Sequence, residues 1–125
     1  MISLRSLITL GAVLAVKHYL ADFIMQTNWM ARGKEQAAGW EWPLLCHALC
    51  HGGLTLLIAL AVAPALWWLA PADLLVHFAI DRGKATLSRR LAYTPSQPRF
   101  WALFGLDQLL HTLTNLAILG CLLAD

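Results

Sequence analysis

Four long apolar segments of the chain each carry a pair of histidine or aspartate side chains spaced four residues apart. The pairs are His18 with Asp22, His47 with His51, His77 with Asp81, and Asp107 with His111. Residues at i and i+4 share one face of an α-helix, so each segment would present two ligand-type side chains on one stripe. The pairs contain all five histidines of the chain and three of its seven acidic residues. The pattern predicts helices that face one another across a shared polar site.

Composition indicates the medium in which such helices fold. Hydrophobic residues make up 59% of the 125 residues and charged residues 13%, about half the usual charged share. A soluble domain of this size buries too little of its surface to hide so much apolar area, whereas a spanning helix needs about 20 mostly apolar residues. We predict an all-α protein, a four-transmembrane-helix bundle forming one integral membrane domain over residues 1–125. Its helices are expected over about 4–28, 43–63, 71–90 and 99–123.

The connections predict an orientation. Residues 30–41 and the turn cluster at 94–98 are polar, and seven lysines and arginines fall in or beside these two regions, against Arg5 alone on the opposite side. The positive-inside rule places both regions in the cytoplasm and both termini on the non-cytoplasmic side. Asp73, two residues after Pro71, is expected to cap the start of the third helix.

Depth along the helices groups the eight residues into two layers. At a rise of about 1.5 Å per residue, Asp22, His47, Asp81 and Asp107 lie at one distance from the cytoplasmic connections. The other four, His18, His51, His77 and His111, lie about one turn deeper. The two halves of the chain also repeat, since His18 and Asp22 match His77 and Asp81, and His47 and His51 match Asp107 and His111. We therefore expect a duplicated helical hairpin.

A charged side chain within a bilayer costs at least about 2.5–3.5 kcal/mol on insertion scales, so the buried aspartates need partners. One explanation is a hydrogen-bonded polar core; four pairs at one depth favour a metal site, of the kind that helix bundles build from facing side chains. Histidine and aspartate ligands suit Zn²⁺ first, with Mn²⁺ or Fe as alternatives. Haem is disfavoured because an aspartate one turn away would crowd a porphyrin. Gln26, Gln108 and Asn115 are the expected partners of the ligands.

Residues 17–30, KHYLADFIMQTNWM, resemble the opening signature of the domain of unknown function 3307 family of small bacterial membrane proteins. The later pairs, with Phe78 after His77 and Gln108 after Asp107, are similar to that family as well. The resemblance implies an integral protein of the bacterial inner membrane and supplies no activity. A looser similarity, in histidine-bearing membrane helices alone, is to membrane-bound metal-dependent hydrolases.

The first functional hypothesis is a metal-dependent hydrolase that acts on lipid-type substrates at the cytoplasmic face. All eight paired residues would be metal ligands, and Asp22, Asp81 or Asp107 would serve as general base. The basic region 82–99 would hold anionic lipid headgroups. The alternatives are a divalent-metal or proton transporter or sensor, a non-haem di-iron oxidoreductase, and a structural accessory protein. The sequence has no basic stripe with interleaved aromatic residues, so nucleic-acid binding is not expected. A homodimer is compatible with so small a bundle.

Overall fold

The computed structural model describes residues 3–124, and every regular element in that range is helical. The elements in chain order are α1 (Leu4–Tyr19), η1 (Leu20–Ile24), α2 (Asn28–Gly33), α3 (Glu41–Val62), η2 (Pro64–Leu66), α4 (Leu69–Leu91) and α5 (Pro98–Ala124). The predicted all-α class is confirmed. The second, third and fourth predicted helices correspond to α3, α4 and α5, with bounds close to those expected from the sequence.

The first predicted helix ends earlier than expected. It closes in a π-helical turn, η1, in which the Met25 N–H donates to the Leu20 carbonyl at 2.8 Å. Thr27 is then extended, and its hydroxyl accepts from the Met30 N–H at 3.2 Å, as an N-cap residue does. This cap starts α2 within the predicted first helix, and α2 then continues into the first residues of the segment predicted as a loop. The interpretation of Thr27 and Asn28 as the end of one long helix was therefore wrong.

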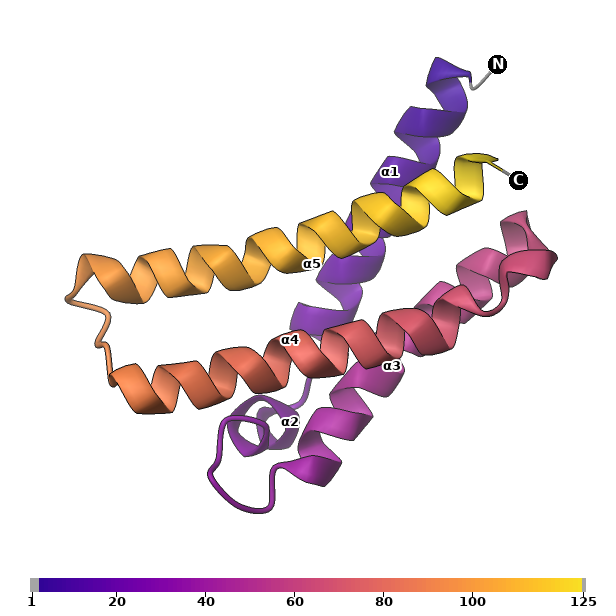
Figure 1. The fold of residues 1–125 in the computed structure, drawn as a ribbon. Coiled ribbons are helices and arrows are strands. Elements are labelled where there is room, and N and C mark those ends of the chain that lie inside the picture. The colour runs from indigo at the N-terminus through magenta and orange to yellow at the C-terminus, as the bar shows by residue number, and fades with distance from the viewer. Residues whose placement is uncertain (1–2, 125) are drawn as a thin grey trace.

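The four long helices pack in a ring. α4 lies against α3 and α5, and α1 lies against α5 and α3. Figure 1 shows both termini and the α3–α4 connection toward one end of the molecule, with α2 and the α4–α5 connection away from it. Three segments are long and apolar enough to cross a membrane, namely Leu4–Ile24, Glu41–Val62 and Pro98–Ala124. α4 is equally long but carries Arg82, Lys84, Arg89 and Arg90 in its last turns.

Many of the buried side chains in the described residues are polar or ionisable, which is unusual for a soluble domain. The buried polar or ionisable side chains are Lys17, His47, His51, Thr55, Asp73, His77, Asp81, Asp107 and His111. Large apolar side chains such as Leu57, Phe23 and Leu75 are instead about two-thirds exposed. Exposed apolar side chains in such number mark a surface made to contact a partner or a membrane, and the apolar helices of the chain are long enough for the second. The polar site is thus the centre of the molecule.

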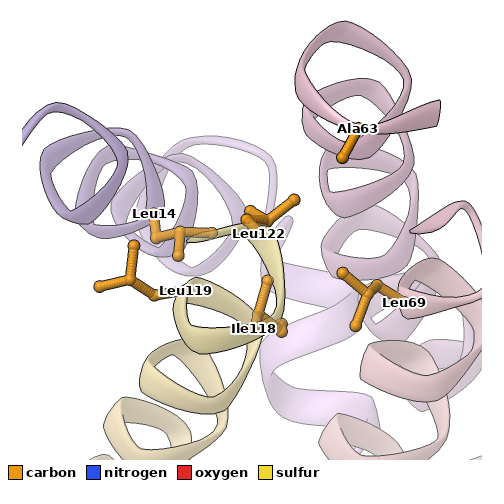
Figure 2. Packing of buried hydrophobic residues seen from close by; sticks show 6 residues of the cluster. All are labelled: Leu14, Ala63, Leu69, Ile118, Leu119 and Leu122. Atoms are coloured by element: carbon orange, nitrogen blue, oxygen red, sulfur yellow. The ribbon is translucent and has the colours of Figure 1, made fainter. Parts of the chain in front are cut away.

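A small hydrophobic cluster closes the bundle on the side of the termini. Its buried members are Leu14, Ala63, Leu69, Ile118, Leu119 and Leu122. Figure 2 shows Leu14 of α1 beside the α5 side chains, with Leu69 at the start of α4 pointing toward them. On the α3–α4 face, a Cβ added at Gly52 would lie 3.0 Å from the Ala70 carbonyl oxygen and 3.0 Å from the Leu74 Cβ. Glycine at this position therefore lets α3 and α4 approach closely beside His51.

Candidate metal centre

The structure brings the histidines of all four long helices together. His51 of α3, His77 of α4 and His111 of α5 form a stack, with ring centroids 3.5 Å apart for the first two and 4.2 Å apart for the last two. The ring of His18, from α1, lies 5.8 Å from the rings of both His51 and His111. These four histidines form a layer of the kind that helical depth predicts. His47 lies 5.0 Å from both the His51 ring and the His77 ring.

Asp22 is the centre of a first metal-capable group, which comprises Asp22, His47, His51 and His77. The Oδ1 atom of Asp22 lies 2.8 Å from His51 Nε2 and 3.3 Å from His47 Nε2. The Nε2 atoms of His47 and His77 are 3.2 Å apart. The π-helical turn carries Asp22, and such turns often occur at functional sites.

Asp81 is the centre of a second metal-capable group, which comprises His77, Asp81 and His111. His111 Nε2 lies 3.1 Å from Asp81 Oδ1, and His77 Nε2 lies 3.6 Å from Asp81 Oδ2. His77 belongs to both groups. His47 Nε2 also lies 3.5 Å from Asp81 Oδ2, so the two groups adjoin.

These separations fit a shared metal ion. Two ligands bound to Zn²⁺ at about 2.0–2.1 Å in tetrahedral geometry lie about 3.3 Å apart. Within each group the ligand atoms lie within 4.8 Å of one another, and the histidines and Asp81 are buried. All the donors are nitrogen or carboxylate oxygen, which is a set suited to Zn²⁺, Mn²⁺ or Fe. The side chains could therefore hold a divalent ion without a change in the positions of the helices.

The remaining two predicted ligands lie at the edge of these groups. His18 Nε2 is 3.1 Å from Asp22 Oδ2, and Asp107 Oδ1 is 3.5 Å from His111 Nε2. Each thus contacts a member of a group and belongs to neither in the described residues. The contact of His18 suits a residue that orients Asp22, whereas Asp107 faces the same His111 nitrogen as Asp81 does. A ligand role for His18 and Asp107 stays a prediction.

Corresponding residues of the two halves make corresponding contacts. His51 contacts Asp22 at 2.8 Å, and His111, 60 residues later, contacts Asp81 at 3.1 Å. The adjacent i, i+4 pairs, His18 with Asp22 and His77 with Asp81, measure 3.1 and 3.6 Å. The shared spacing in the sequence thus corresponds to a shared local geometry.

A further polar layer lies one turn beyond the histidines. Lys17 forms a buried ion pair with Asp73, whose Oδ2 also accepts from the Thr55 hydroxyl at 2.6 Å, while Asn115 Oδ1 accepts from Lys17 at 3.3 Å. Asp73 is therefore no helix cap, because α4 begins at Leu69 and the carboxylate points into the bundle. The four-residue spacing of Thr55, Asp73 and Asn115 from the histidines was the sequence signal for this layer.

The expected partners of the ligands behave differently from one another. Gln108 Nε2 donates to Asp107 Oδ2 at 3.2 Å, whereas Gln26 Nε2 donates to the backbone carbonyl of Asp22 at 3.0 Å. Asn115 contacts Lys17 instead of a histidine. Among the described residues, His47 Nδ1, Asp107 Oδ1 and Gln26 Oε1 are buried without a hydrogen-bond partner.

Sequence reasoning missed Lys34, which follows α2 and reaches into the site. Its Nζ lies 2.7 Å from Asp81 Oδ2. The segment around it is fastened to α4, because Arg89 donates to the Glu35 carbonyl at 2.8 Å and Arg82 stacks 3.7 Å over the Trp40 ring. Several basic residues assigned to lipid headgroups are thus used within the protein, and no spacing in the sequence pointed Lys34 toward Asp81.

A comparison with protein families matches residues 10–124 to the family described as protein of unknown function (DUF3307). No curated protein and no solved structure matches the chain. The family match covers α1 from residue 10 onward and the other three long helices, and it includes every residue of the two metal-capable groups.

Proposed function

Since this chain belongs to the DUF3307 family, whose description gives no activity, we propose its function from the site itself. The protein is an integral membrane protein with a His/Asp metal centre near the cytoplasmic face, and it acts as a metal-dependent hydrolase of lipid-type substrates. The observation that carries this proposal is the convergence of imidazole and carboxylate atoms from four helices into two adjoining groups.

We propose that α4 crosses the membrane together with the three apolar segments, giving a four-helix bundle with both termini on the non-cytoplasmic side of a bacterial inner membrane. The buried side chains of α4 support this arrangement because Asp73, His77 and Asp81 face inward at four-residue spacing, while Leu75 and Val76 are exposed. The ring order also supports a duplicated hairpin, since α1 lies across from α4 and α3 across from α5.

The first group would hold a divalent ion through Asp22, His47, His51 and His77, and the second through His77, Asp81 and His111. Zn²⁺ is the first choice, with Mn²⁺ or Fe as alternatives. Because His77 belongs to both groups, we expect one or two ions in each chain. His18 would orient Asp22 through the contact described above.

The chemistry divides between the ion and the protein. A divalent ion held here would polarise a phosphoryl or acyl oxygen and make a nearby water more acidic. Asp107 is the best-placed general base, because its Oδ1 is buried without a hydrogen-bond partner and its side chain lines a pocket beside His111. Asp107 would take the proton of the attacking water, and Asp22 and Asp81 would hold the ion together with the histidines.

Elemental analysis of protein purified in detergent without chelator tests the metal centre. We expect one or two zinc, manganese or iron atoms per chain, lost in the His51→Ala/His111→Ala double variant because each substitution removes a ligand from a different group. Asn115→Ala is the matched control, since the side chain of Asn115 contacts Lys17 and not a histidine, and it should retain metal. Substoichiometric metal that is equal in all three proteins would mean a hydrogen-bonded polar core.

The hydrolase assignment has its own test, in which Asp107→Asn should keep the metal and lose most ester hydrolysis. Removing a positioned general base typically costs about 10²–10⁴-fold in rate. Hydrolysis that survives in a His77→Ala/Asp81→Ala variant would contradict the assignment.

A further inference from the structure

A polar pocket opens directly onto the metal-capable groups. It has a volume of about 260 Å³ and lies between η1, α2, α4 and α5. Its lining includes Asp22, Asp81 and His111 of those groups, together with Asp107. A molecule bound in this pocket would reach the candidate site, so the remaining lining residues indicate what the pocket accepts.

Two lysines line the same pocket. Lys34 donates to Asp81 at 2.7 Å and Lys84 donates to Glu35 at 2.8 Å. An ammonium group carries three N–H donors, and each lysine uses one of them in these contacts. Each lysine therefore has donors left for a ligand, in a pocket partly shielded from solvent, where a charge-assisted hydrogen bond is stronger than in water.

The pocket also has an apolar side. Phe23 of η1 and Phe104 of α5 line it, and both are exposed on the outer surface, by 67% and 44%. Both side chains lie on the outer surface of segments that are apolar enough to cross a membrane. The pocket thus connects the polar site with a lipid-type surface, as a binding site for an amphiphile requires.

We propose that this pocket binds the phosphate headgroup of a membrane lipid, with Lys34 and Lys84 holding the phosphate oxygens and Phe23 and Phe104 flanking the acyl chain. This inference rests on the proposed hydrolase function and names its substrate class. A phosphate monoester carries about −1.5 to −2 charges at pH 7. The pocket is lined by more carboxylates than ammonium groups, namely Asp22, Glu35, Asp81 and Asp107, and a divalent ion in the proposed metal centre would offset that excess of negative charge. Lysine clamps of this kind also stabilise a phosphoryl group during transfer.

The test is binding of dioctanoyl phosphatidic acid to the purified full-length protein in detergent, measured by calorimetry beside dioctanoyl phosphatidylcholine and inorganic phosphate. We expect phosphatidic acid to bind most tightly. The Lys34→Gln/Lys84→Gln variant should bind it roughly tenfold or more weakly, because two charge-assisted hydrogen bonds are lost. Arg90→Gln is the matched control, since it removes an exposed basic residue that does not line this pocket, and it should bind phosphatidic acid as the wild type does.

Three results would overturn the inference. They are equal binding of the two lipids, unchanged binding in the double variant, and inorganic phosphate binding as tightly as phosphatidic acid, which would make the ligand a soluble phosphate. Lys84→Gln alone guards against misfolding, because Lys84 contacts Glu35 and not the metal-capable groups. Metal content is measured on the same samples. If the wild-type protein contains no metal but binds the lipid through the lysines, only the hydrolase proposal is contradicted. If the protein contains metal but binds the lipid equally well without the lysines, only this inference is contradicted.

Discussion

At the scale of single residues, the most testable contact outside the site is the buried pair of Lys17 and Asp73. Removing one member leaves an uncompensated charge in the interior, which typically costs about 3–5 kcal/mol. Lys17→Met should therefore lower the free energy of unfolding by about that amount. Lys17→Met/Asp73→Leu should recover most of the loss, because Thr55 can donate to its own helix backbone once the carboxylate is gone.

Chemical denaturation in detergent, followed by circular dichroism, measures both effects. A single variant as stable as the wild type would mean that the remaining polar groups of the layer compensate for the missing charge. Asn115→Leu serves as the control, since its contact with Lys17 is the longer one at 3.3 Å and its loss should cost less.

At the scale of elements, the close approach of α3 and α4 depends on one of two adjacent glycines. A Cβ at Gly52 would meet the Ala70 carbonyl oxygen and the Leu74 Cβ, both at 3.0 Å, whereas a Cβ at Gly53 meets nothing within 4 Å. Gly52→Ala should therefore push the helices apart and cost about 1–3 kcal/mol, as overpacking does. Gly53→Ala should be neutral or stabilising by up to about 1 kcal/mol, because alanine is the better helix former. Thermal unfolding of the two variants in the same detergent checks this, and equal behaviour would contradict the packing described.

The helices could be predicted from the sequence because apolar length and four-residue spacing are local signals. The i, i+4 pairs also predicted that His51, His77 and His111 would meet, since three helices of one bundle present them at the same depth. The break after Ile24 could not be predicted from hydropathy, because the π turn and the Thr27 cap lie within a stretch that remains compatible with a helix. The contact of Lys34 with Asp81 depends on how a connecting segment folds back, and no periodicity encodes that.

At the scale of the whole molecule, the open question is whether the chain crosses the membrane three or four times. Four crossings put residue 96 on the side opposite the N-terminus, and three crossings without α4 put it on the same side. We expect Ser96→Cys and Ala38→Cys, in a background with Cys46, Cys50 and Cys121 replaced by alanine, to react with an impermeant maleimide in inverted bacterial membrane vesicles. Ser6→Cys should react in spheroplasts instead. All three positions are exposed, and Ser96→Cys that reacts from the same side as Ser6→Cys would contradict the four-helix bundle.

The position of His77 at the junction of the two metal-capable groups bears on the history of the chain. Its counterpart in the first half, His18, has a polar contact with the Asp22 carboxylate and belongs to neither group in the part of the chain that the structure describes. Two separate copies of one hairpin, related by symmetry, would have to place both histidines equivalently. If the two halves descend from one ancestral hairpin, joining them in a single gene allowed the two histidines to diverge. The different positions of His18 and His77 relative to the metal-capable groups would then have arisen after the two halves were joined, because a symmetric homodimer could not have placed them differently.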